Sequence, residues 1–264
     1  MKNLFFLFLF FCNFAIFAQS PFGRPAIIRD LGIEQRMGAQ VPLDLPFQDE
    51  NGKAVTLRQY TGKPIILALV YYQCPSLCNM VMSGLLKSAK ILQLTAGKEY
   101  EIVAISFDAT ETPSLAAAKK AAYVEGYGRD PEGHGWNLLT GSADSSKAVA
   151  DSVGFRFAFD KATNQFAHPS AIMLLTSEGR VARYLYGIDY PARELRLGLV
   201  EASNDRIGSA VDRALLFCFR YDPATSKYGL AIVNLLRVAG VMTALGLIGF
   251  LFILLRQERG VEIR

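Results

Sequence analysis

The chain has 264 residues, of which 51% are hydrophobic and 20% are charged, and its formal net charge is +4. This length is enough for a sizeable hydrophobic core in one large domain or two small ones. The basic residues are scattered, and no run of Lys and Arg with interleaved aromatic residues indicates nucleic-acid binding. The hydrophobic excess lies at the two ends of the chain.

The N-terminus, residues 1–18, has the layout of a secretory signal peptide. Lys2 precedes an apolar block, Leu4–Phe17, that is short for a bilayer span, and Ala18 provides a small residue before the cut. A retained N-terminal anchor is the alternative. A lipoprotein signal ending at Cys12 fits less well, because a bulky phenylalanine stands where a small residue is expected.

Residues 19–39 mix Pro, Gly and charge, and they are predicted to form an extended arm before a domain over residues 40–202. The domain begins with a predicted hairpin around Asn51-Gly52, a dipeptide typical of tight turns. Next, Ile65–Tyr72 is a continuous, partly β-branched apolar run. Such a run is typical of a strand that is covered on both faces.

The rest of the domain alternates between helical and strand-like patterns. Helices are predicted over residues 77–92, 114–127, 144–153 and 192–202. Strands are predicted over residues 101–107, 136–139, 155–159, 170–176 and 180–186, the last two forming a hairpin. This alternation predicts an α/β domain built around one sheet.

Residues 229–255 are predicted to form a transmembrane helix, joined to the domain by a linker over residues 203–228. No charged residue occurs from Val238 to Leu255, and at about 1.5 Å per residue this stretch crosses about 27 Å of hydrocarbon. Basic residues in the tail, 256–264, place that tail in the cytoplasm by the positive-inside rule. The domain is therefore expected on the periplasmic side of the membrane. A buried core helix is the alternative.

The stretch YYQCPSLCNM places two of the four cysteines close together. Cys74 ends the predicted strand and Pro75 suits the first position of a helix, so Cys78 lies one turn further on, about 6 Å away at Cα. This spacing allows a structural disulfide, a redox couple or two ligands of one metal ion. The helix N-terminus is expected to lower the pKa of the thiols.

A third soft ligand would favour the metal, and the chain has only two histidines. His134 lies in a polar, Gly-rich loop and is expected to be solvated. His168 precedes Pro169 before a strand, and thioredoxin-like folds place a proline there, facing the cysteine-bearing helix. If Pro169 holds that place, His168 projects towards both thiols. Two thiolates and one imidazole suit Cu(I) and tolerate Cu(II), whereas zinc usually takes a fourth ligand or water. A histidine that only caps a strand is the alternative.

These motifs resemble the Sco/SenC family over about residues 40–202. Besides the cysteine pair and His168, the resemblance is carried by Ser106-Phe107-Asp108, Thr112-Pro113, Trp136–Gly141 and Ala171–Leu175. It implies a thioredoxin-like copper protein that assists maturation of the copper A centre of cytochrome c oxidase. It also implies that Cys74, Cys78 and His168 bind copper, with Asp108 beside the site. The oxidase subunit that carries copper A would be the partner, and a thioredoxin-like reductant could keep the cysteines reduced.

Two features depart from the family pattern. Many relatives are tethered by an N-terminal helix, whereas this chain is predicted to be anchored at its C-terminus, which leaves the client open. His-Pro also replaces the commoner His-Ser at His168, although a proline there agrees with the thioredoxin-type loop. Neither departure removes a proposed ligand.

The predicted function is a membrane-anchored copper-binding assembly factor that delivers copper to the copper A site or prepares it. The main alternative is a thiol–disulfide oxidoreductase acting through Cys74 and Cys78, although their spacing departs from the two-residue spacing of thioredoxins. A peroxiredoxin-type peroxidase is disfavoured because no arginine is clearly placed beside Cys74. Cys218, between aromatic residues, is expected to be a buried hydrophobic residue near the membrane, with a metal or intermolecular disulfide role as alternatives.

Overall fold

The computed structural model describes residues 31–74, 77–161, 163–204, 221–222, 227–228 and 240–249. A seven-stranded sheet in the order β11-β10-β4-β5-β6-β2-β3 forms the centre of the domain. Its strands are β2 (Phe47–Gln48), β3 (Ala54–Val55), β4 (Ile65–Val70), β5 (Glu101–Ser106), β6 (Trp136–Gly141), β10 (Ala171–Leu175) and β11 (Val181–Tyr186). The helices are α3 (Leu77–Ile91), α4 (Pro113–Tyr127), α5 (Ala143–Ser152) and α6 (Ala192–Ser203), with a 3₁₀ turn, η2, at Leu57–Tyr60.

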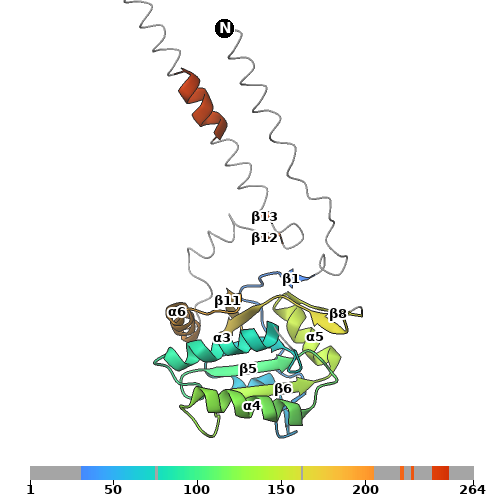
Figure 1. Cartoon of the computed structure of the whole chain (residues 1–264). Helices are drawn as coiled ribbons and strands as arrows, with labels where there is room; N and C mark the ends of the chain where they lie inside the picture. Colours follow the sequence, from blue (N-terminus) through green and yellow to red (C-terminus); the bar gives the residue numbers. More distant parts are fainter. Residues whose placement is uncertain are drawn as a thin grey trace, which may run out of the picture.

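The centre of the sheet is parallel and follows β4-α3-β5-α4-β6 along the chain. β4 pairs in parallel with β5, and β5 with β6. Right-handed crossovers between these neighbouring strands place α3 and α4 on one face. α3 contacts both α4 and α6, and Figure 1 shows α3 and α4 packed along the sheet that contains β5 and β6. Every residue of β4 is buried, as the continuous apolar run predicts.

The two predicted hairpins are present. β2 pairs with β3 in antiparallel fashion, and in the turn the Asp49 carboxylate accepts the backbone N–H groups of Asn51 and Lys53, both at 2.9 Å. Gly52 has a φ of +76°, a conformation that favours glycine. β10 pairs with β11 on one side and with β4 on the other, both antiparallel. The chain segment before β10 therefore ends beside the end of β4, shortly before Cys74.

The helix boundaries follow from local capping and close packing. The Thr112 side chain accepts the Leu115 N–H at the start of α4, and Gly128 ends α4 in the left-handed conformation. On α3, a Cβ atom at Gly84 would lie 1.8 Å from the Ile188 carbonyl oxygen. Only glycine permits this approach, so α3 is seated directly on the loop that precedes α6.

The structure contains one hairpin that the sequence did not predict. The alternating segment at residues 155–159 was expected to be a single strand, but it divides into β7 (Phe155–Arg156) and β8 (Ala158–Asp160). β7 pairs with β1 (Gly32–Ile33), in the described end of the predicted arm. β8 pairs with β9 (Gln165–Ala167), and β9 leads directly into His168.

The ends of the chain lie mostly outside the described residues. This applies to the predicted signal peptide, to Cys12 and Cys218, and to the cytoplasmic tail. Within the predicted linker, β12 (Tyr221–Asp222) pairs with β13 (Lys227–Tyr228). Residues 240–249 are helical, and within the described ranges no helix has the length and apolar character needed to cross a membrane. The transmembrane helix over residues 229–255 remains a prediction.

Candidate metal centre

Cys74 and Cys78 lie where β4 gives way to α3. Both are buried, with 4% and 2% of their surface exposed, and neither forms a disulfide. The Cys78 N–H donates to the Cys74 sulfur at 3.4 Å, and the Tyr71 N–H donates to the Cys78 sulfur at 3.4 Å. The side-chain amide of Asn79 donates to the Cys74 carbonyl oxygen at 2.8 Å. The turn thus holds both sulfurs on the same side of the helix start.

His168 completes the group. Its Nε2 atom is 3.0 Å from the Cys78 Sγ, and its Nδ1 atom is 2.9 Å from the Pro169 carbonyl oxygen. Because a carbonyl oxygen can only accept, Nδ1 must carry the proton, and the Nε2 lone pair then faces the sulfur. The ligand atoms of Cys74, Cys78 and His168 all lie within 4.8 Å of one another and could hold one metal ion.

Burial controls the protonation of this group. Desolvation lowers the pKa of His168, against the opposing effect of its bond with Pro169, so its imidazole is neutral near pH 7 and can act as a ligand. Desolvation also raises the pKa of Cys78, although the Tyr71 N–H acts in the opposite direction. The expectation that the helix N-terminus lowers the thiol pKa is therefore wrong for Cys78, because desolvation of the buried thiolate outweighs the favourable backbone dipoles.

Aromatic rings surround the imidazole. The ring centroids of Phe107, Tyr71 and Phe155 lie 5.3, 6.0 and 6.2 Å from that of His168. Phe157 stacks on Phe107 at 4.4 Å. Burial raises the pKa of Tyr71, and its hydrogen bond with Cys74 raises it further. This apolar shell limits the access of water to the sulfur and nitrogen atoms.

The structure places two carboxylates near the ends of β4 and β5, in different roles. The Asp108 carboxylate, expected beside the site, accepts the N–H and hydroxyl of Thr110 at 2.9 and 2.7 Å and so closes a local turn. Glu111 is the buried acid, with 7% of its surface exposed, and it bonds to the backbone immediately before Cys74. The sequence alone did not identify Glu111 as part of the site. The only sequence signal for Glu111 was the position of an acidic residue just beyond β5. Because β5 runs parallel to β4, the carboxyl ends of the two strands lie at the same edge of the sheet.

His134 is outside the group, as predicted. Its side chain is exposed, with Nδ1 at 3.2 Å from Asp130 and Nε2 at 3.1 Å from Glu132. The two ring nitrogens therefore face different carboxylates in the solvent-exposed loop, which makes His134 a suitable control for His168.

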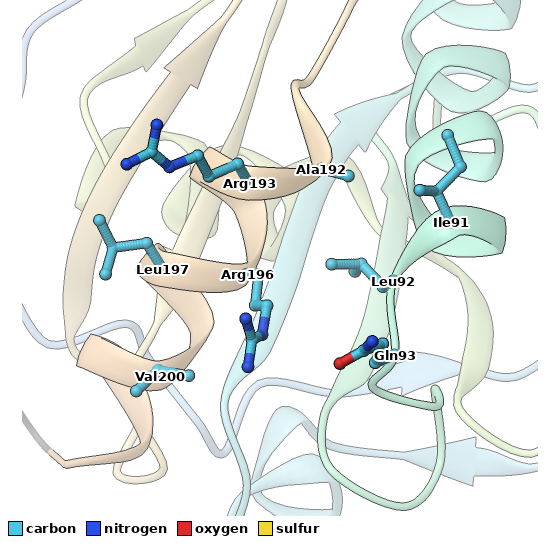
Figure 2. A pocket seen from close by; sticks show the side chains of 8 residues that line it. All are labelled: Ile91, Leu92, Gln93, Ala192, Arg193, Arg196, Leu197 and Val200. Carbon is cyan, nitrogen blue, oxygen red and sulfur yellow. The ribbon is translucent and has the colours of Figure 1, made fainter.

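A separate groove of about 560 Å³ lies between the end of α3 and α6. Figure 2 shows its lining side chains, which are Ile91, Leu92, Gln93, Ala192, Arg193, Arg196, Leu197 and Val200. None of the three candidate ligands lines this groove. In the candidate metal centre both cysteines are buried and His168 is partly buried.

Acid is expected to destabilise the metal-free chain through His168. In the folded state burial lowers the pKa of His168 from its ordinary value of 6.5, so on acidification the unfolded chain takes up this proton first. The free energy of unfolding should be fully retained above about pH 6.5 and should fall as the pH drops through the lower folded value. Urea denaturation of the metal-free chain across this range should show the fall in wild type and in His134→Gln. In His168→Gln the profile should be flatter, and an unchanged profile would contradict this account.

The fold and the three side chains define a thioredoxin-like α/β domain with a candidate centre of two thiols and one imidazole. The sequence profile of the SCO1/SenC family matches residues 35–196. Since the match spans more than half of the chain, the chain belongs to the SCO1/SenC family. The predicted family and its α/β, thioredoxin-like fold are thereby confirmed.

Several solved structures are similar to this chain. A candidate electron transfer protein from Aquifex aeolicus VF5 is 28% identical with a TM-score of 0.57, the match covering 64% of this chain and 95% of that chain. BsSco, described as a member of the Sco family of cytochrome c oxidase assembly proteins with a disulfide switch, is 20% identical with a TM-score of 0.50, covering 65% and 98%. Arabidopsis thaliana ScoI, solved with copper bound, is 23% identical with a TM-score of 0.49, covering 64% and 99%. No curated protein matches the chain.

Proposed function

We propose that the chain is a membrane-anchored copper-binding assembly factor that delivers copper to, or prepares, the copper A site of cytochrome c oxidase. The single observation that carries the copper assignment is the position of His168. Its Nε2 atom lies 3.0 Å from the Cys78 sulfur, although His168 and Cys78 are 90 residues apart in sequence. A histidine that only capped a strand would have no reason to face the thiols.

The chemistry of the donors favours copper over other metals. Thiolate sulfur selects Cu(I), and imidazole nitrogen also suits copper. Structural zinc sites almost always have four protein ligands, whereas the ligand group found among the described residues comprises Cys74, Cys78 and His168 alone. Copper in this position would be the cargo that the protein accepts and hands over.

The protein's own groups would prepare the site for the ion. The Pro169 carbonyl fixes the imidazole tautomer, so His168 can bind without first losing a proton. The Cys78 pKa is raised, so this thiol keeps its proton until the ion arrives, and ion binding then releases the proton. The surrounding aromatic rings restrict water. If the two cysteines were oxidised to a disulfide, two of the three donors would be lost.

The client and location are proposed on other grounds. BsSco is described as belonging to a family of cytochrome c oxidase assembly proteins, and the oxidase subunit that carries copper A is the proposed partner here. The predicted signal peptide and the apolar segment at residues 229–255 support a domain on the periplasmic side with a cytoplasmic C-terminus. Retention of the chain in membranes after alkaline carbonate washing would test the anchor.

Anaerobic titration with Cu(I) tests the copper proposal. The full-length chain, reduced and purified in detergent, should withdraw one equivalent of Cu(I) per chain from a chromophoric chelator. Zn(II) should bind more weakly, because three donors leave its tetrahedral coordination shell incomplete. Failure to compete with the chelator, or an equal preference for zinc, would overturn the proposal.

Thiol–disulfide exchange is the second candidate function. Its specific support is that neither cysteine is held in a disulfide and that the Cys78 N–H donates to the Cys74 sulfur, a contact that stabilises a Cys74 thiolate. This activity would need an external thioredoxin-like reductant to restore the dithiol. It would not need His168, and this difference separates the two functions experimentally.

A further inference from the structure

We propose that Glu111 is a positioning residue for the metal centre: its buried carboxylate fixes the turn that presents Cys74. The inference rests on the proposed copper function, and it assigns to Glu111 a role that acts through the backbone. The carboxylate does not belong to the ligand group.

Glu111 is buried without a compensating cation. Among the described residues it takes part in no ion pair, and only 7% of its surface is exposed. Moving an uncompensated carboxylate out of water is strongly unfavourable. Here three donors replace water: the Tyr72 N–H at 2.7 Å, the Gln73 N–H at 2.6 Å and the Ser106 hydroxyl at 2.6 Å. Such short charge-assisted bonds are among the strongest in proteins.

The two backbone donors belong to the segment that needs support. β4 ends at Val70, so the following N–H groups no longer have partners in the sheet. Tyr71 donates to the Cys78 sulfur, and Cys74 donates to the Tyr71 carbonyl oxygen. The intervening N–H groups, of Tyr72 and Gln73, both donate to Glu111. All four backbone donors of the turn are therefore satisfied, and one side chain satisfies half of them.

Glu111 is itself held by the neighbouring strand. The Ser106 hydroxyl, at the end of β5, donates to Glu111 and accepts the Asp108 N–H at 3.1 Å. The carboxylate therefore connects the end of β5 to the cysteine turn at the end of β4. If this connection is lost, the turn keeps its covalent path but loses the two bonds that orient it, and the Cys74 sulfur is no longer fixed relative to Cys78 and His168.

The test compares Glu111→Gln with Glu125→Gln in the full-length chain in detergent. Glu125 is exposed on α4, so it provides the same substitution without a role in the turn. Glutamine keeps one acceptor oxygen but presents an N–H₂ group to a backbone N–H. We expect a loss of about 10- to 100-fold in Cu(I) affinity, the usual effect of losing a partner outside the ligand shell, together with faster alkylation of the two thiols. Glu125→Gln should match wild type in both measurements.

Ser106→Ala provides a milder variant in case Glu111→Gln does not fold. It removes one donor to the carboxylate and leaves both backbone bonds, so its loss of Cu(I) affinity should be smaller but in the same direction. The inference would be overturned if a folded Glu111→Gln variant had the Cu(I) affinity and alkylation rates of wild type. If Glu111→Gln does not fold, the same result in Ser106→Ala would overturn it. Absence of Cu(I) binding in wild type would instead overturn the proposed function, while the alkylation measurement would still test the role of Glu111.

Discussion

Replacing His168 with alanine is expected to lower the affinity for Cu(I) by roughly 100-fold or more, because the loss of a direct ligand should exceed the 10- to 100-fold effect of losing an outer partner. The two thiols would remain, so the variant should still undergo dithiol oxidation and reduction. Competition against a chromophoric Cu(I) chelator under anaerobic conditions would measure the first effect. Thiol quantification after equilibration in redox buffers would measure the second.

His134→Ala is the matched control for this experiment. It removes the only other histidine, and the structure places that side chain in an exposed loop between Asp130 and Glu132. Its Cu(I) affinity should equal that of wild type. Equal affinity in His168→Ala would refute the ligand assignment and would leave thiol–disulfide exchange as the better-supported function. Loss of dithiol cycling in His168→Ala would indicate a wider collapse of the site.

The elements that direct the cysteines could be predicted because their patterns are local. The apolar run of β4 and the helical period of α3 determine a strand and a helix, and the intervening cysteine motif must then lie at their junction. The hairpin that follows Pro169 was also visible, since two strand-like segments meet at a turn containing glycine. These predictions needed only the spacing of apolar residues and turn-forming residues.

The position of the His168 ring could not be derived from local pattern alone. It depends on β10 pairing with β4 rather than with another strand, which is a choice among long-range arrangements. The prediction succeeded because a proline before a late strand has a known place in thioredoxin-like folds. The β8–β9 hairpin, which delivers the chain to His168, was missed because its strands are short and little buried.

The roles of the two acids illustrate a different limit. Asp108 was expected beside the ligands through resemblance, and in the structure its carboxylate accepts bonds from Thr110. Glu111 looks like an ordinary polar residue before a helix, and nothing in its neighbourhood in sequence indicates burial. Its burial becomes evident only when the unpaired N–H groups after β4 are accounted for. Burial also explains the pKa of the Cys78 thiol. Desolvation of the thiolate outweighs its favourable contact with the Tyr71 N–H, so the pKa rises instead of falling.

Oxidation of Cys74 and Cys78 to a disulfide is expected to abolish stabilisation by copper. A ligand that binds only the folded state adds about 4.1 kcal/mol to the free energy of unfolding when its free concentration is 1,000 times Kd. The reduced chain should therefore gain stability in a Cu(I) buffer, by about that amount at this ratio. The oxidised chain retains only the imidazole and should gain almost none. Urea denaturation of both forms, with and without buffered Cu(I), would measure the difference.

Cys78→Ser separates the loss of a donor from disulfide formation. Serine keeps the approximate volume but replaces the sulfur that contacts His168. This variant should therefore resemble the oxidised chain in Cu(I) while remaining unable to form the internal disulfide. If the oxidised chain were stabilised by copper as strongly as the reduced chain, the sulfurs could not be the ligands. If Cys78→Ser retained the full stabilisation, Cys74 and His168 would suffice for binding. Because one pair of sulfurs serves both chemistries, copper binding and disulfide formation must compete, and the redox state of the cysteines would then decide when the ion is held.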